Sequence, residues 1–111
     1  MYKITYKFKL LVFSAYLARN ADHSYNVITV DWEKLASPNT SILFSVLFYD
    51  SAVENVAIAG KRVGEFISWL QSQGQIDPTK THLVGHSLGS QVSGWAGATV
   101  ANMTGTVLGR I

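Results

Sequence analysis

A serine between two glycines constrains this chain more than any other feature. The stretch GHSLG, residues 85–89, follows the short apolar run THLVGH, residues 81–86, and precedes a segment whose apolar residues recur every three or four positions. The run predicts a β-strand and the periodicity predicts a helix. In a tight strand-to-helix turn the residues two before and two after Ser87 pass close to each other. We therefore expect a Cβ at Gly85 or at Gly89 to clash.

This arrangement is typical of a nucleophilic serine. The pattern G-x-S-x-G between a strand and a helix marks the nucleophile elbow of α/β-hydrolases. Such a turn strains the serine backbone and presents its hydroxyl at a helix N-terminus, where unpaired N–H groups favour negative charge. The backbone N–H of Leu88 is then the expected donor to an oxyanion. The alternative interpretation is a glycine-rich turn in which Ser87 only caps the helix.

The surrounding segments predict a parallel β-α-β-α unit. Residues 25–32, YNVITVDW, form a continuous apolar run of the kind found in strands covered on both faces. Residues 50–73 carry an apolar stripe at helical spacing, and Gly74 is a plausible stop. A second strand at 81–86 and a second helix at 88–103 complete the order. The expected fold class is therefore α/β with right-handed crossovers, a fragment of an α/β-hydrolase fold.

Three other segments are less regular. The N-terminal residues 1–21 allow two interpretations. Apolar residues alternate with lysines and a threonine over 2–10, as in a half-buried strand, but the whole stretch also resembles a signal peptide. Residues 41–49 fit a buried strand or a helix segment equally well. Residues 77–80 predict a turn, with Pro78 fixing its φ.

Composition narrows the possible functions. The 111 residues allow one domain at most, and an apolar share of 48% is enough for a packed core. A net charge of +2 is too weak for a nucleic-acid surface, and the absence of cysteine excludes disulfides and thiolate metal sites. No apolar stretch reaches the ~18 residues of a membrane span. Two Asn-x-Ser/Thr triplets, at Asn39 and Asn102, would permit a secreted, glycosylated protein.

Three stretches together resemble the pancreatic-lipase-like family of secreted lipases and phospholipases A1: YNVITVDW, AVENVAIAGKRVGEFISWL and HLVGHSLGSQVSGWAG. The resemblance extends over about residues 15–111. It implies an extracellular serine hydrolase that cleaves lipid carboxyl esters through an acyl-enzyme, at a lipid–water interface and without a metal or organic cofactor. By position Ser87 matches the nucleophile and Leu88 the oxyanion donor. Gly85 and Gly89 match the elbow glycines.

The partners of the serine are missing from the rest of the chain. In α/β-hydrolases the acid and then the histidine follow the serine. The 24 residues after Ser87 (111 − 87) contain no Asp, Glu or His. Residues 1–14 contain no glycine or histidine, so the second oxyanion donor of the family has no match. We therefore expect residues 1–111 to be a partial lipase-like domain without the acid and histidine segments, and nearly inactive alone.

Upstream residues are weak substitutes for this acid and base. His82 begins the predicted second strand, and the side chain of His86 should leave the turn in another direction than that of Ser87. His23 precedes the first predicted strand, and nothing in the sequence directs it at Ser87. Asp31 ends that strand and could share a sheet edge with Ser87, but the resemblance places it in the structural VDW segment and not in the triad. Two alternatives to the enzyme stay open at this point. One is a non-catalytic lipid-binding or storage protein on a lipase scaffold, and the other is a globular fragment without activity.

Overall fold

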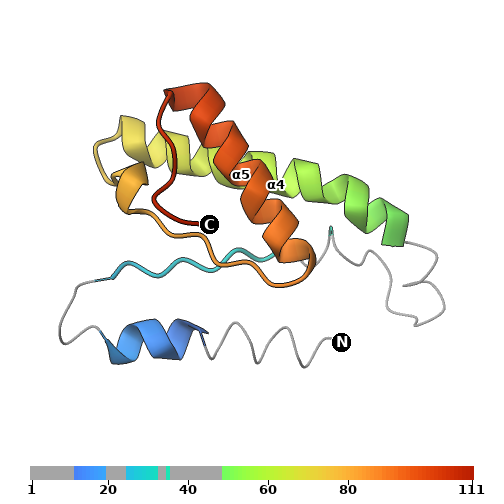
Figure 1. The fold of residues 1–111 in the computed structure, drawn as a ribbon, viewed down its shortest axis with the longest axis horizontal. Helices are drawn as coiled ribbons and strands as arrows, with labels where there is room; N and C mark the ends of the chain where they lie inside the picture. The colour runs from blue at the N-terminus through green and yellow to red at the C-terminus, as the bar shows by residue number, and fades with distance from the viewer. Residues whose placement is uncertain (1–11, 20–24, 33–34, 36–48) are drawn as a thin grey trace. The chain divides into compact units, whose positions relative to one another are not determined.

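The computed structural model describes residues 12–19, 25–32, 35 and 49–111, with the side chains of 49–52 excepted. The chain divides into two compact units, Met1–Asp31 and Trp32–Ile111, coloured along the chain in Figure 1. The predicted strand at 2–10 lies outside the described residues, as does nearly all of the ambiguous segment 41–49.

The first unit contains a short helix over residues 12–18. The backbone N–H of Arg19 donates to the Tyr16 carbonyl at 3.2 Å, which closes the last turn of this helix. The Tyr16 ring meets the Tyr25 ring edge to face, with centroids 5.4 Å apart. This aromatic pair ties the helix to the start of residues 25–31, which form neither helix nor strand.

The second unit is built on helices α4 (Tyr49–Ser72) and α5 (Leu88–Thr104), with the short 3₁₀-helix η1 (Pro78–Lys80) between them. The predicted stop after α4 is confirmed, because Gly74 has φ +68°. Its N–H donates to the Gln71 carbonyl and the N–H of Gln75 donates to the Leu70 carbonyl, the paired bonds of a Schellman ending. Among the described helices, none is long and apolar enough to cross a membrane.

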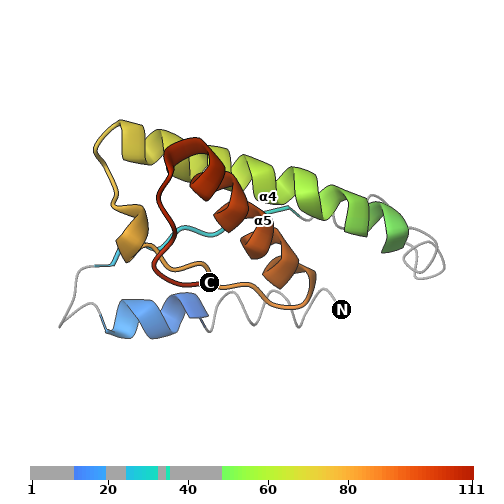
Figure 2. The same ribbon diagram turned by 45° about the horizontal axis from the view of Figure 1, so that its top comes forward.

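Helices α4 and α5 cross in direct contact, as the two views in Figures 1 and 2 show. Gly60 and Gly64 make this contact possible. A Cβ on Gly60 would lie 2.7 Å from the Val92 carbonyl oxygen, and one on Gly64 would lie 2.8 Å from that of Ala96. Both positions are buried, so the missing side chains let the two backbones approach closely.

The core of the second unit lies along this crossing. Its buried centre is Val56 and Ala59 of α4 with Val92 of α5, while Ala96 and Val100 extend the buried face of α5. Trp32, Val63 and Leu88 pack against the centre as half-buried neighbours. The buried Ser68 hydroxyl donates to the Gly64 carbonyl at 2.8 Å, so this polar group is satisfied within its own helix.

The predicted fold class is wrong for the described residues, which are mostly helical and contain no β-strand and no sheet. The predicted strand at 81–86 forms a single isolated parallel bridge, His82 with Arg110. Residues 25–32 make no ladder, and Ile28 is 62% exposed where burial on both faces was predicted. The physical reason is that strand-forming side chains do not suffice: a strand exists only where a neighbour completes a ladder of backbone hydrogen bonds.

Candidate active site

The GHSLG stretch forms the turn at Ser87 and the first two residues of α5. The N–H of Gly89 donates to the His86 carbonyl at 2.9 Å, and the N–H of Ser90 donates to the Ser87 carbonyl at 3.0 Å. The Ser90 hydroxyl donates to the same Ser87 carbonyl at 2.6 Å. Three hydrogen bonds therefore close the chain around Ser87 and hold its backbone in place.

The steric expectation holds for one glycine of the pair and fails for the other. A Cβ on Gly85 would overlap the backbone carbonyl of Gly89 and lie 2.6 Å from the Ser90 nitrogen. A Cβ on Gly89 would meet nothing within 4 Å. Gly85 is therefore required by the close approach of backbone to backbone, while Gly89 contributes the backbone that Gly85 approaches.

Ser87 has an unusual backbone conformation. Its φ of 56° and ψ of −125° make it the one described residue other than glycine with a positive φ. Such a conformation costs an L-residue on the order of 1–3 kcal/mol and persists only where the surroundings impose it. The Ser87 side chain is exposed and makes no capping hydrogen bond to α5. The capping interpretation of this serine is therefore wrong.

Leu88 connects the turn to the core. Its side chain packs against the cluster of Val56, Ala59 and Val92, which fixes the first residue of α5. As that first residue, Leu88 has an N–H without an acceptor inside the helix. The N–H lies next to the strained serine, at the end of α5 where the helix dipole favours negative charge. This arrangement can stabilise an anion that forms at Ser87.

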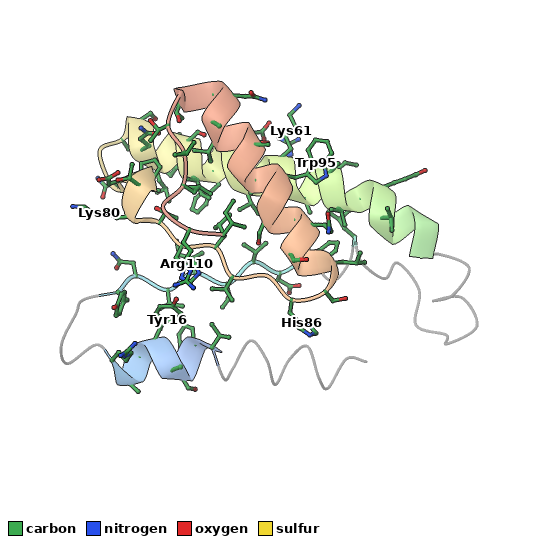
Figure 3. The ribbon with its side chains drawn as sticks, viewed as in Figure 1. Tyr16, Lys61, Lys80, His86, Trp95 and Arg110 are labelled. Carbon is green, nitrogen blue, oxygen red and sulfur yellow. The ribbon has the colours of Figure 1, made fainter. Side chains whose placement is uncertain are left out.

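Two histidines lie close to Ser87 in the sequence, and both are exposed. His86 directly precedes Ser87, is exposed, and points away from α5 in Figure 3. His82 is exposed at the isolated bridge with Arg110. Asp31 is an exposed residue of the first unit, and His23 lies outside the described residues. Within the part of the chain that the structure describes, no three His, Asp or Glu residues form a group that could hold a metal ion.

Sequence reasoning missed the support that the C-terminal segment gives to this region. The N–H of Gly109 donates to the Pro78 carbonyl at 3.0 Å, and Arg110 exchanges two backbone hydrogen bonds with Thr81 and Leu83. These bonds fix the start of the segment that leads into Ser87. No local sequence pattern predicts these hydrogen bonds, because their partners lie far apart in the sequence and the bonds involve backbone groups only.

Comparisons with known proteins agree with the motif. The family model described as Lipase matches residues 10–111. The chain is 35% identical over 71 residues to phospholipase A1 of Vespa velutina, which is 64% of this chain and 23% of that protein. It is 36% identical over 86 residues to pancreatic triacylglycerol lipase of Myocastor coypus, or 78% of this chain and 17% of that protein. For human hepatic triacylglycerol lipase the identity is 37% over 75 residues, 68% of this chain and 13% of that protein.

No solved structure matches the chain significantly. The chain spans less than a quarter of the length of each of these three relatives. The family model, in contrast, covers every described residue of the chain, including the GHSLG turn and both long helices. The chain therefore belongs to the lipase family.

Proposed function

We propose that this chain carries the nucleophile of an enzyme that hydrolyses lipid carboxyl esters, with Ser87 as that nucleophile. One observation carries the proposal: an exposed serine is held at φ 56° and makes no capping bond. Backbone strain at an exposed residue that caps nothing and fills no core has no structural benefit. It is the kind of strain that proteins keep at functional sites.

The chemistry follows from the two adjacent residues. The Ser87 oxygen attacks the ester carbonyl, and the carbonyl oxygen becomes an oxyanion that accepts a hydrogen bond from the Leu88 N–H. The C–O bond to the alcohol then breaks, and the alcohol leaves with the proton that the Ser87 hydroxyl gave up. Water next cleaves the acyl-enzyme, which releases the acid and restores the Ser87 hydroxyl. Loss of one oxyanion donor typically lowers turnover by about 100- to 1,000-fold. The core contact of the Leu88 side chain keeps this donor in position.

The chain alone should turn over very slowly. Residues 88–111 supply no Asp, Glu or His, and a serine hydroxyl is a weak nucleophile until a base takes its proton. Loss of triad members typically costs about 10⁴- to 10⁶-fold in turnover. Ser87 would therefore need an acid and a base from outside residues 88–111.

The names of the relatives set the scope of the substrate. Two are triacylglycerol lipases and one is a phospholipase A1. The proposal therefore concerns the ester class that these substrates share, presented at a lipid–water interface outside the cell. It names no metal or organic cofactor as a partner, because attack by serine on an ester requires neither.

A chimera tests the nucleophile directly. Residues 82–104 of this chain would replace the aligned segment of Vespa velutina phospholipase A1, which supplies the remainder of that enzyme. We expect a fluorophosphonate probe to label the chimera and the label to disappear in a Ser87→Ala variant. A folded chimera that takes no label would overturn the assignment of Ser87.

The 111-residue chain tests the expectation that residues 1–111 alone are nearly inactive. It should take no label under the conditions that label the chimera. Labelling of the short chain that disappears on Ser87→Ala would show that a base lies within it and would contradict the expected inactivity. The denaturant midpoint of each variant serves as the control for folding.

A further inference from the structure

Asn102 belongs to one of two Asn-x-Ser/Thr triplets in the sequence, Asn102-Met103-Thr104, and the function proposed above does not use it. The triplet forms the last turn of α5, directly before Gly105, whose φ of 71° ends the helix. Asn102 and Met103 are exposed, Met103 at 58%. A bulky group on the Asn102 amide would therefore meet solvent and would displace no core side chain.

We propose that Asn102 is a site of N-linked glycosylation. This inference rests on the extracellular location in the proposed function, because the modifying machinery lies in the secretory pathway, but it is independent of the chemistry of Ser87. The transfer uses a lipid-linked oligosaccharide diphosphate as the donor. The Nδ2 atom of Asn102 forms a bond to C1 of the first sugar and loses a proton, while the C1–O bond to the diphosphate breaks and the lipid diphosphate leaves.

The structure also indicates when the transfer occurs. In the folded chain the Thr104 hydroxyl donates to the Val100 carbonyl at 2.7 Å and accepts from the Thr106 N–H at 3.1 Å. A threonine hydroxyl that already donates one hydrogen bond and accepts another inside a helix turn is not available to an enzyme that recognises the Asn-x-Thr triplet. The glycan is therefore added to the extended chain before α5 forms. Once the helix has folded, the glycan projects into solvent.

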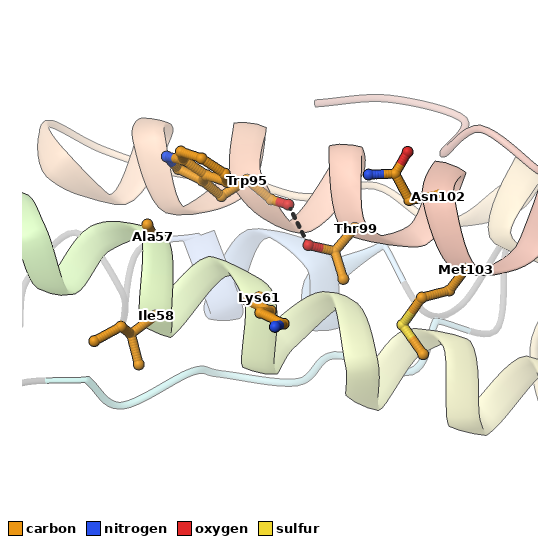
Figure 4. Close-up of a pocket in the computed structure, with 7 residues that line it drawn as sticks. All are labelled: Ala57, Ile58, Lys61, Trp95, Thr99, Asn102 and Met103. Atoms are coloured by element: carbon orange, nitrogen blue, oxygen red, sulfur yellow. Dashed lines mark hydrogen bonds between the residues drawn. The ribbon is translucent and has the colours of Figure 1, made fainter.

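The glycan would stand beside an apolar cavity. Asn102 lines a cavity of about 390 Å³ between α4 and α5 together with Ile58, Trp95 and Met103, all of which are more than half exposed. Asn102 and Trp95 are seven residues apart, which places them on one face of α5 about 10 Å apart along its axis. The Asn102 amide points away from α4 at the edge of this cavity (Figure 4). Here the first sugars can cover the indole of Trp95.

The test needs a chain with a single asparagine that can accept the glycan. An Asn39→Gln variant of the full 111-residue chain, directed into secretory microsomes by an added leader, keeps the triplet at Asn102 alone. We expect one glycan, seen as a mass that peptide N-glycosidase removes. Asn102→Gln and Thr104→Ala should abolish it, while Thr104→Ser, which keeps the hydroxyl, should retain it. An unmodified Asn102 peptide in translocated chain would overturn the proposal.

Two further comparisons make the outcome specific. Ser87→Ala should be glycosylated like its parent, which separates a failure here from a failure of the proposed catalytic role. Collisional quenching of tryptophan fluorescence should increase when the glycan is removed, and Trp95→Phe should remove that increase. Equal quenching before and after removal would overturn the placement of the glycan beside the cavity.

Discussion

Two turns flank residues 81–86, and each begins a helix in a different way. At the first turn Asp77 has an ordinary φ of −106° and caps η1, because its carboxylate accepts from the Thr79 N–H at 2.9 Å and from the Thr79 hydroxyl at 2.6 Å. At the second turn Ser87 has φ 56° and caps nothing. Capping and backbone preference account for the first turn completely. The second turn departs from both, as we expect if its conformation serves the proposed role of Ser87 rather than helix capping.

The largest expected effect separates the two glycines of the second turn. Gly85→Ala should destabilise the second unit by about 3 kcal/mol, because the new Cβ meets the backbone of Gly89 and Ser90, which cannot rotate away. Gly89→Ala is the matched control and should change stability by less than about 1 kcal/mol, since its Cβ enters open space. Urea denaturation of both variants makes the measurement. Equal losses would mean that the turn is not sterically closed at Gly85.

A somewhat smaller loss tests whether the second turn is anchored from the core. Leu88→Ala should cost about 2 kcal/mol, because it removes a half-buried side chain from the Val56, Ala59 and Val92 cluster. In a longer chimera that grafts residues 49–104, and so includes Val56 and Ala59, the same change should slow fluorophosphonate labelling of Ser87 without abolishing it, because the turn is then held less firmly. A labelling rate equal to that of the parent would show that the core contact does not position the serine.

The strain itself predicts a gain in stability. Ser87→Gly should stabilise the chain by about 1 kcal/mol, the relief of the positive φ less the added entropy of an unfolded glycine. Ser87→Ala keeps the strain and should leave the free energy of unfolding nearly unchanged. Both variants should lose labelling in the chimera. A loss of stability in Ser87→Gly would remove the contrast between the two turns.

The smallest effect concerns the first turn. The hydrogen bond from the Thr79 hydroxyl, followed by that from the Thr79 N–H, lowers the pKa of Asp77, and the charge of Lys80 adds to this. Because the folded pKa lies below the unfolded value of about 3.9, the cap stabilises above that pH. This stabilisation is lost as the pH falls through the folded pKa. Thr79→Val should raise the pKa of Asp77, as followed by the carboxyl ¹³C shift. An unchanged titration would show that the hydroxyl bond is absent in solution.

Local signals in the sequence predicted the two long helices well but missed the short helix over residues 12–18. The predicted ranges 50–73 and 88–103 differ by one residue at most at each end from α4 (Tyr49–Ser72) and α5 (Leu88–Thr104). Helical spacing and a glycine stop are both read within a few residues, so they need no knowledge of distant parts of the chain. Strand pairing is different. Among the residues that the structure describes, 81–86 pair only with the segment around Arg110, and 25–32 form no ladder.

In the candidate site, too, the features set by neighbouring residues could be predicted and those set by distant residues could not. The strained turn at Ser87 could be predicted from GHSLG, because close approach and backbone strain are encoded within those residues. Which of the two glycines would clash depends on the direction of each Cα–Cβ bond, and the spacing does not encode that direction. The contact of Leu88 with the α4 side chains depends on how two helices cross, which the sequence of the turn does not contain.

The close crossing at Gly60 and Gly64 has a mechanical consequence for the serine. Since α5 lies directly on the α4 backbone there, we expect a rotation or shift of α4 to displace the first turn of α5 as well. Sequence drift on α4 can therefore retune how Ser87 presents its oxygen while every residue of the turn itself stays the same. The glycine crossing thereby links the packing of α4 to the position of the proposed nucleophile.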